Sequence, residues 1–228
     1  MLQNKIVLIT GSSKGLGREI ARFFHNNGAK VILHYFLGGE NAIKLSKELG
    51  AFLVQGDLTK KERVEFIFSQ IREKYGKIDI LINNVGNFYF KNILNLSDEE
   101  FKDEIESNLY SVWNTMKAVN GLMDKGKIIN FTCVGADKLA IRKNTTPYYI
   151  SKAGVLMLTK NFAEEFSNIQ VNSISLGVLE SSIVIPESAK GKEVNFSQVI
   201  DVIKEIIFSD KTGENIELSN SWYPEGYN

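Results

Sequence analysis

The sequence predicts a single α/β domain with a doubly wound parallel sheet, arranged in three layers with helices on both faces. Six short apolar segments resemble strands and alternate with longer segments of helical periodicity. These segments are mostly apolar rather than alternating, which is typical of strands that are covered on both faces. Repeated strand–helix–strand units favour a parallel sheet. The predicted strands are residues 5–10, 30–35, 51–55, 78–82, 127–132 and 169–175.

Length and composition limit the classes of protein that fit. The chain has 228 residues, 43% of them hydrophobic, so one domain over residues 1–228 can bury a sizeable core. Basic and acidic residues number 27 each, so no net charge recruits nucleic acid or a membrane surface. One cysteine excludes an internal disulfide, and two histidines leave little for a zinc site, so we expect no metal. The apolar runs are too short for a signal peptide or a membrane span, which indicates the cytoplasm.

Two further segments have interpretable patterns. A long helix is predicted to begin at Ser97, because Ser97 and Glu100 have the spacing of a capping box. Its apolar residues recur at helical spacing and are Phe101, Ile105, Leu109, Val112, Trp113 and Met116. Residues 178–198 lack clear periodicity and follow the last of the six predicted strands. Because ligands in such folds lie beyond the carboxyl ends of the strands, we expect 178–198 to form a mobile loop over the substrate.

A glycine-rich turn follows the first predicted strand directly and opens the first predicted helix. Its glycines are Gly11, Gly15 and Gly17, and they allow a tight turn and a close approach of the backbone to a pyrophosphate. The pyrophosphate would meet the unpaired N–H groups at the helix N-terminus. A plain glycine-rich turn is the alternative. The strand before it and the helix after it favour a Rossmann-type dinucleotide site.

Tyr148 and Lys152 lie one turn apart on another predicted helix. A nearby ammonium favours the phenolate, so Lys152 would lower the pKa of Tyr148 from about 10 toward the working pH. That property suits a general acid for carbonyl reduction. Thr146 and Pro147 fit the N-cap and the first helical residue, which places Tyr148 in the first turn, at a cleft.

Taken in order, these motifs resemble the short-chain dehydrogenase/reductase family, in particular its 3-oxoacyl-carrier-protein reductase branch. The spacing Gly-x-x-x-Gly-x-Gly is this family's form of the glycine motif, and Tyr148-x-x-x-Lys152 matches its catalytic pair. Segment 83–86 (NNVG) resembles its element after the fourth strand. Segment 171–177 (VNSISLG) resembles its late strand, with Leu176 in place of the usual proline, and segment 212–216 (TGENI) resembles the entry to its last strand.

The resemblance implies an oxidoreductase that transfers hydride between NADP(H) and a small carbonyl, alcohol or acyl-thioester substrate. Tyr148 would protonate the carbonyl oxygen, Lys152 would bind the nicotinamide ribose, and Asn108 would hold a water in a proton relay. The residues implied to contact the cofactor are Gly11, Ser13, Lys14, Gly15, Leu16, Gly17, Tyr35, Asp57, Leu58, Asn84, Val85, Gly86, Tyr148, Lys152 and Gly177. The family pairs two long helices across a twofold interface. Apolar residues surround more than one face of segment 150–166, so we expect a homodimer or homotetramer.

The end of the second predicted strand bears on which nicotinamide is bound. In this family an acidic residue there holds the ribose hydroxyls of NAD, but residues 33–36 (LHYF) contain no carboxylate. A carboxylate would repel the extra phosphate of NADP. Its absence, together with the cation of Lys14 in the glycine-rich turn, favours NADPH over NADH. A merely solvated lysine is the alternative for Lys14.

Cys133 stands where the family places the serine whose hydroxyl binds the substrate carbonyl. A thiol is a weak donor, and loss of a good donor to a developing oxyanion costs on the order of 100- to 1000-fold in rate. Three readings stay open: Cys133 substitutes weakly; Thr132, Thr145 or Thr146 supplies the hydroxyl; or catalysis is lost. In the third case the chain binds NADP as a sensor or as an inactive partner in a hetero-oligomer. A covalent cysteine nucleophile is disfavoured, because neither histidine is placed to act as its base.

Overall fold

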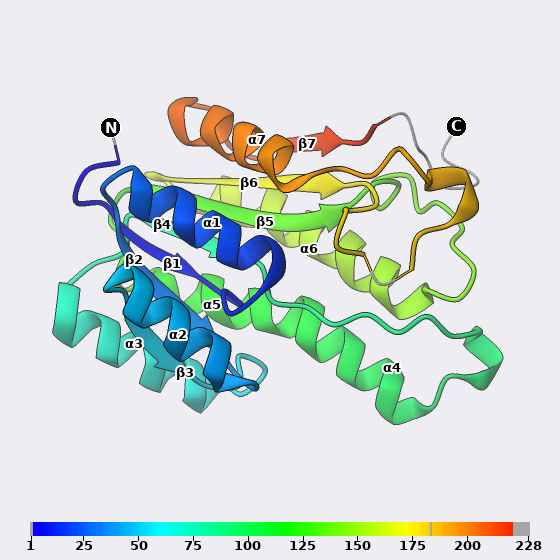
Figure 1. The fold of residues 1–228 in the computed structure, drawn as a ribbon, viewed down its shortest axis with the longest axis horizontal. Coiled ribbons are helices and arrows are strands. Elements are labelled where there is room, and N and C mark those ends of the chain that lie inside the picture. Colours follow the sequence, from blue (N-terminus) through cyan, green and yellow to red (C-terminus); the bar gives the residue numbers. More distant parts are fainter. Residues whose placement is uncertain (1, 183, 221–228) are drawn as a thin grey trace.

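The computed structural model describes residues 2–182 and 184–220, and over them the predicted parallel sheet is confirmed (Figure 1). The strands are β1 (Ile6–Ile9), β2 (Lys30–Tyr35), β3 (Phe52–Gln55), β4 (Ile80–Asn83), β5 (Gly126–Cys133), β6 (Ile169–Leu176) and β7 (Asn215–Leu218). They form one seven-stranded sheet in the order β3-β2-β1-β4-β5-β6-β7. The six strands predicted from apolar runs agree within two residues at each end. Short and polar β7 followed only from the family resemblance.

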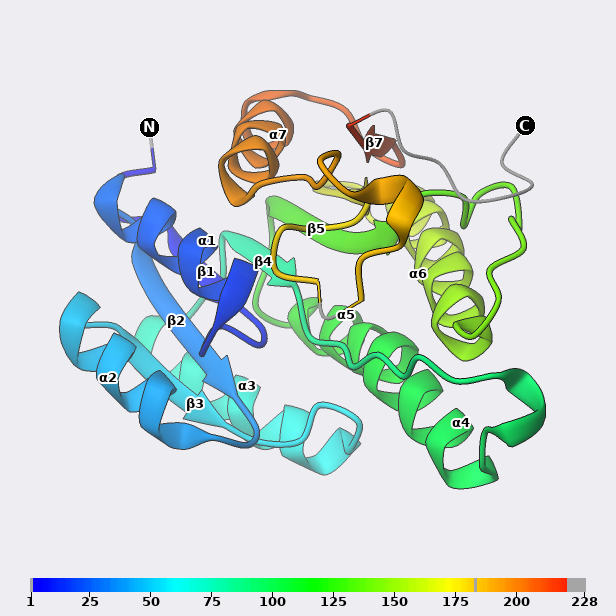
Figure 2. The same cartoon turned by 45° about the vertical axis from the view of Figure 1, so that its right-hand side comes forward.

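Helices cover the sheet in two layers, which completes the predicted three-layer fold (Figure 2). One layer consists of α1 (Gly15–Asn26), α2 (Gly39–Leu49) and α7 (Phe196–Phe208). The other consists of α3 (Lys61–Tyr75), α5 (Ser111–Val119) and α6 (Thr146–Glu165). Each layer closes its own apolar cluster, represented by Ile20 and Phe24 in the first and by Ile71 and Met116 in the second. In the described part of the chain no helix is both long and apolar enough to cross a membrane.

Three successive helical segments carry Asn108, the residue predicted to support the proton relay. They are α4 (Asp98–Ile105), the π-helical turn η2 (Glu106–Tyr110) and α5. The predicted capping box is confirmed: Ser97 Oγ accepts from the Glu100 N–H, and the Glu100 carboxylate accepts from the Ser97 N–H. The predicted apolar face is buried at Val112 and Met116. It is wrong at Phe101 and Trp113, which are 39% and 41% exposed.

A chain of buried hydrogen bonds ties the helices to the centre of the sheet. Thr115 Oγ1 on α5 donates to Asn83 Oδ1 on β4 at 2.8 Å, and Asn83 Nδ2 donates to Asn130 Oδ1 on β5 at 2.8 Å. Asn130 Nδ2 then donates to Thr159 Oγ1 on α6 at 2.9 Å. An unpaired buried group would cost roughly 1–3 kcal/mol, so these contacts fix how α5 and α6 lie on the sheet.

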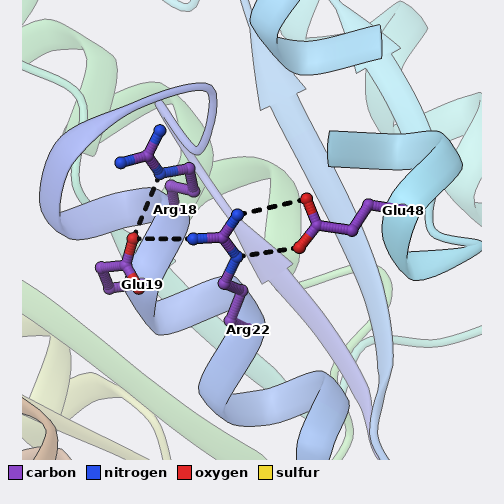
Figure 3. Close-up of polar contacts among 4 residues, drawn as sticks. All are labelled: Arg18, Glu19, Arg22 and Glu48. Carbon is purple, nitrogen blue, oxygen red and sulfur yellow. Dashed lines mark hydrogen bonds and ion pairs between the residues drawn. The ribbon is translucent and has the colours of Figure 1, made fainter. Parts of the chain in front are cut away.

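An exposed ion-pair network joins α1 to α2 (Figure 3). The Arg22 guanidinium donates to both carboxylate oxygens of Glu48, at 2.9 and 3.1 Å. Glu19 accepts from Arg22 and Arg18 on the same helix, at 3.2 and 3.1 Å. Because solvent screens such pairs, the network orients the two helices more than it stabilises them.

Two boundary predictions require correction. The N-cap of α6 is Thr145 rather than Thr146, so the helix begins at Thr146, one position earlier than predicted. Of segment 178–198, residues 196–198 belong to α7, whose capping box joins Asn195 to Gln198. The rest of that segment contains the one-turn helix η3 (Glu187–Ala189). Another one-turn helix, η1 (Ile93–Asn95), lies earlier in the chain, before α4. The mobility predicted for this segment stays a prediction.

Candidate active site

The glycine-rich turn connects the end of β1 to the start of α1. Gly11 and Gly15 have φ of +62° and +53°, which favours glycine. A Cβ on Gly17 would lie 2.4 Å from the Gly11 carbonyl oxygen and 2.6 Å from Asn84 Nδ2. A Cβ on Gly15 would meet none of the described residues within 4 Å, and α1 begins there with no side-chain cap from Lys14. The N-terminus of α1 therefore faces open space and fits the pyrophosphate of a dinucleotide.

Asn84, which follows β4, holds this turn in place. Its Nδ2 donates to the carbonyl oxygens of Thr10 and Gly11, at 3.1 and 3.0 Å. The backbone N–H groups of Asn84 and Val85 both donate to Thr10 Oγ1, at 2.8 and 3.1 Å. The side-chain amide is thus engaged in positioning the turn, and the contact of Asn84 and Val85 with a cofactor stays a prediction.

His34 fastens the same turn from β2, a role that the sequence did not reveal. Its Nδ1 accepts from the Gly11 N–H at 3.2 Å, and its Nε2 lies 2.9 Å from the Gly56 carbonyl oxygen. The first contact requires the tautomer with the proton on Nε2, which then donates to Gly56. Burial lowers the pKa of His34 to about 4, so the ring is neutral at neutral pH. His34 therefore links the turns after β1 and β3.

The other residues predicted to contact the cofactor lie around this edge of the sheet. Lys14 is exposed and Ser13 partly buried in the turn itself. The Tyr35 ring packs against Gly39, where a Cβ would lie 2.9 Å from it. Asp57 Oδ1 accepts from the Thr59 N–H at 2.9 Å. The buried side chains in this set belong to the core and are Leu16 and Leu58, so these two residues can offer a ligand only their backbone.

Lys152 and Tyr148 come together on α6 above the end of β5. Lys152 Nζ donates to the Phe131 carbonyl oxygen at 3.1 Å and lies 5.3 Å from the centre of the Tyr148 ring. Burial lowers the pKa of Lys152 to about 8. Burial, and then the nearby Cys133, raises the pKa of Tyr148 well above its ordinary value. The predicted lowering is therefore wrong for this geometry, because desolvation outweighs an ammonium placed at the ring.

Cys133, rather than Thr132, lies near the tyrosine. Thr132 Oγ1 is 2.7 Å from Ser175 Oγ and is engaged within the sheet. Cys133 is buried and interacts electrostatically with Lys152 and Tyr148. Burial raises the pKa of its thiol to about 12, so the sulfur is a neutral thiol and not a nucleophilic thiolate.

Thr145 and Thr146 are the other two candidates for the hydroxyl that would bind the substrate carbonyl. The structure shows neither of them in contact with Tyr148. Thr145 Oγ1 donates to the Arg142 carbonyl oxygen at 3.2 Å. Thr146 lines a separate pocket of about 460 Å³ between α6 and the loop after β5. Tyr149 lines the same pocket, and its hydroxyl donates to the Val134 carbonyl oxygen at 3.0 Å.

Two of the positions expected to depart from the family pattern, Cys133 and Leu176, are neighbours in space. Cys133 on β5 and Leu176 on β6 are register partners in the parallel ladder. The next residue after Leu176, Gly177, donates its N–H to the Leu218 carbonyl oxygen at 2.9 Å. Cys133 and Leu176 therefore lie in one local region at the carboxyl ends of β5 and β6.

Asn108 on η2 and Glu104 on α4 form a buried polar pair. Asn108 Nδ2 donates to the carbonyl oxygens of Asn87 and Glu104, at 2.9 and 3.0 Å, and a Cβ on Gly86 would lie 2.3 Å from Asn108 Oδ1. The carboxylate of Glu104 accepts from the Tyr89 N–H at 3.0 Å. Glu104 Oε2 and Asn108 Oδ1 are the buried side-chain atoms without a hydrogen-bond partner among the residues described. Sequence reasoning missed Glu104, whose i, i+4 spacing to Asn108 was the available signal.

Glu104→Gln should stabilise the fold at alkaline pH. Burial raises the pKa of Glu104 from 4.5 to about 7. The protonated carboxyl stabilises the fold fully below its unfolded pKa, and that contribution is lost as pH rises through about 7. Above pH 7 the neutral glutamine should therefore gain roughly 3 kcal/mol over wild type in the free energy of unfolding. Urea titrations at pH 4.5 and 8.5 measure it, with Glu106→Gln, a solvent-accessible neighbour, as control. Equal gains at both pH values would contradict the expectation.

Comparison with known proteins agrees with this geometry. The family model described as short chain dehydrogenase matches residues 5–192. Oxidoreductase UcpA of Salmonella typhimurium is 36% identical over 190 residues, 79% of this chain and 71% of that protein. The 3-oxoacyl-[acyl-carrier-protein] reductase FabG of Staphylococcus epidermidis is 29% identical over 245 residues, 96% of this chain and 99% of that protein.

A solved structure shows the same fold over nearly the whole chain. The crystal structure of a single-substitution variant of actinorhodin polyketide ketoreductase with NADPH superposes with a TM-score of 0.84 at 25% identity, covering 96% of this chain and 97% of that one. The family match covers well over half of the chain, and the glycine-rich turn and the Tyr148/Lys152 pair lie inside it. The chain therefore belongs to the short-chain dehydrogenase family.

Proposed function

We propose that this protein transfers hydride between NADP(H) and a carbonyl or alcohol substrate, with Tyr148 as general acid and base. The observation that carries the proposal is the convergence of Tyr148, Lys152 and Cys133 at the carboxyl end of β5. The glycine-rich turn opens at the same edge of the sheet, two strands away. This is the edge at which doubly wound folds bind their ligands.

The side chains divide the work in the direction of reduction. Bound NADPH would supply the hydride. Burial keeps the Tyr148 hydroxyl protonated at neutral pH, so it can donate its proton to the carbonyl oxygen as charge develops there. The Lys152 ammonium would stabilise the phenolate that remains. Asn108 would support the return of a proton from solvent.

NADP rather than NAD is supported at the end of β2. Tyr35 and the exposed Phe36 present no carboxylate that would repel a phosphate, and Lys14 is an exposed cation in the neighbouring turn. The ketoreductase that shares the fold is described with NADPH. The substrate class is supported by the names of the relatives, which include a 3-oxoacyl thioester reductase and a polyketide ketoreductase. The segment between β6 and α7, residues 178–182 and 184–195, would cover such a substrate.

A second candidate is an NADP-binding protein without turnover, serving as a sensor or as an inactive partner in a hetero-oligomer. The observation that favours it is the pairing of Cys133 with Leu176. Both departures from the family pattern fall on the expected substrate side, while the cofactor turn keeps its glycines. Turnover distinguishes the two candidates.

Tyr148→Phe tests the proposed role of the tyrosine. The variant keeps the ring, including its edge-on contact with Phe88 at 5.2 Å, but removes the proton donor. We expect NADPH oxidation with a panel of ketones and 3-oxoacyl thioesters to fall by roughly 100-fold or more. NADPH affinity, measured by fluorescence titration, should change little. A variant as active as wild type would contradict the assignment.

Cys133→Ser tests whether the thiol limits the reaction. A hydroxyl is the stronger donor to the developing oxyanion, so kcat should rise by roughly tenfold or more. Cys133→Ala should lower kcat below the wild-type value if the thiol acts as a weak donor. Thr132→Val should leave kcat unchanged, because Thr132 binds Ser175. Equal kcat values for wild type, serine and alanine variants would show that position 133 does not contact the carbonyl.

We infer a homodimer or homotetramer from exposed apolar side chains on α4, η2, α5 and α6. They are Phe101, Tyr110, Trp113, Ile150 and Met157. Exposed apolar clusters of this kind mark interfaces between chains. Light scattering should give at least the dimer mass for wild type, and a monomer for Trp113→Glu. Phe66→Glu, at an exposed apolar position on α3, should keep the wild-type mass. A monomeric wild type would contradict this.

A further inference from the structure

Glu104 is a buried carboxylate that the mechanism above does not use. Its side chain is fully buried, and its Oε2 has no hydrogen-bond partner within residues 2–182 and 184–220. It lies at the contact of α4 with α6: the Ser151 hydroxyl, adjacent to Lys152 in sequence, is 3.5 Å from the Glu104 carbonyl oxygen. We propose that Glu104 is a positioning residue for Lys152, whose buried carboxylate is the counter-charge that keeps the Lys152 ammonium protonated.

Three contacts fix Glu104 in this place. Its carboxylate accepts from the Tyr89 N–H at 3.0 Å, which holds it against the segment after β4. Its carbonyl oxygen accepts from Asn108 Nδ2 at 3.0 Å across the π-helical turn, and from Ser151 on α6. The carboxylate therefore cannot turn out to solvent without breaking the Tyr89 contact. A buried charge held in this way is costly unless an opposite charge faces it.

The charged and titratable groups around the pair come from α4, α6, the end of β5 and the segment after β4, where Tyr89 interacts electrostatically with Glu104. Asp103 on α4 opposes the ionisation of Glu104, and Lys152 on α6 favours it. Tyr148 on α6 also faces Glu104. Lys152 in turn faces Cys133 at the end of β5 and Glu104.

Of the two groups that favour the ammonium, only Glu104 is ionised near neutral pH. Burial raises the pKa of the Cys133 thiol to about 12, so Cys133 carries no charge there. Burial raises the pKa of Glu104 to about 7, which leaves a carboxylate above that pH. Burial alone drives Lys152 toward the neutral amine, with a pKa of about 8. Losing the carboxylate would therefore lower the fraction of Lys152 that carries a proton at working pH.

The catalytic part of this inference rests on the proposed function, but the electrostatic part does not. The direct test is the ¹³C NMR titration of protein labelled at lysine Cε, with the Lys152 signal assigned through Lys152→Arg. Glu104→Gln keeps an acceptor for the Tyr89 N–H and removes the charge. Its Lys152 should bind a proton roughly tenfold more weakly than in wild type, with its midpoint at lower pH.

Two further variants test whether the shift in the Lys152 midpoint is specific to the Glu104 carboxylate. Glu106→Gln removes a carboxylate from the adjoining turn of helix that pairs with Lys60 and Lys102, and it should leave the Lys152 midpoint unchanged. Glu104→Asp keeps the carboxylate, one methylene further back. Its midpoint should lie between those of wild type and Glu104→Gln, which also decides the question if the glutamine variant does not fold.

The alkaline limb of the kcat profile provides the catalytic readout. It should move to lower pH in Glu104→Gln and stay in place in Glu106→Gln. A Lys152 midpoint that is the same in wild type, Glu104→Gln and Glu104→Asp would overturn the inference. A shifted midpoint in a protein that turns over no carbonyl would uphold the inference and count against the proposed reductase function.

Discussion

The rest of the site depends on one buried charge, the ammonium of Lys152 on α6, which lies beside the end of β5. Lys152 gives up its hydration and receives in return one hydrogen bond from the described residues, to the Phe131 carbonyl oxygen at 3.1 Å, and a contact with the Tyr148 ring. Such a charge is stable only on a rigid support. The buried chain from Thr115 through Asn83 and Asn130 supplies it, because it ends at Thr159, two turns further along α6. The position of α6 in turn places Tyr148.

The same burial favours the neutral form of Lys152 and of each titratable group around it. It keeps Tyr148 and Cys133 protonated, and it pushes Lys152 and Glu104 toward their neutral forms. A protonated phenol suits proton donation to a carbonyl, whereas a neutral thiol is a weaker donor than the serine it replaces. In the proposed reaction the site would thus combine a protonated acid, Tyr148, with a weaker donor, Cys133. Glu104 adds a conflict of its own, since its carboxylate supports the cation but costs stability.

The sequence predicted the fold and the glycine-rich turn better than the surroundings of Tyr148 and Lys152. Strands with continuous apolar runs and a glycine turn such as Gly11–Gly17 are local patterns, and they can be read from the chain alone. The role of Glu104 depends on which groups α6 brings to it across the fold. The pKa of Tyr148 was mispredicted for a related reason: helical spacing gives proximity to Lys152 but says nothing of desolvation. His34 was missed because its two partners follow different strands.

The central claim is that hydride leaves the cofactor for a carbonyl carbon at this site. A single-turnover experiment with NADPH deuterated at the transferring position of its nicotinamide ring measures this directly, by mass spectrometry of the product. The account predicts an alcohol with one deuterium on its carbinol carbon, formed by wild type and faster by Cys133→Ser. Tight binding of the cofactor, with all deuterium retained on it in both proteins across ketones and 3-oxoacyl thioesters, would contradict it.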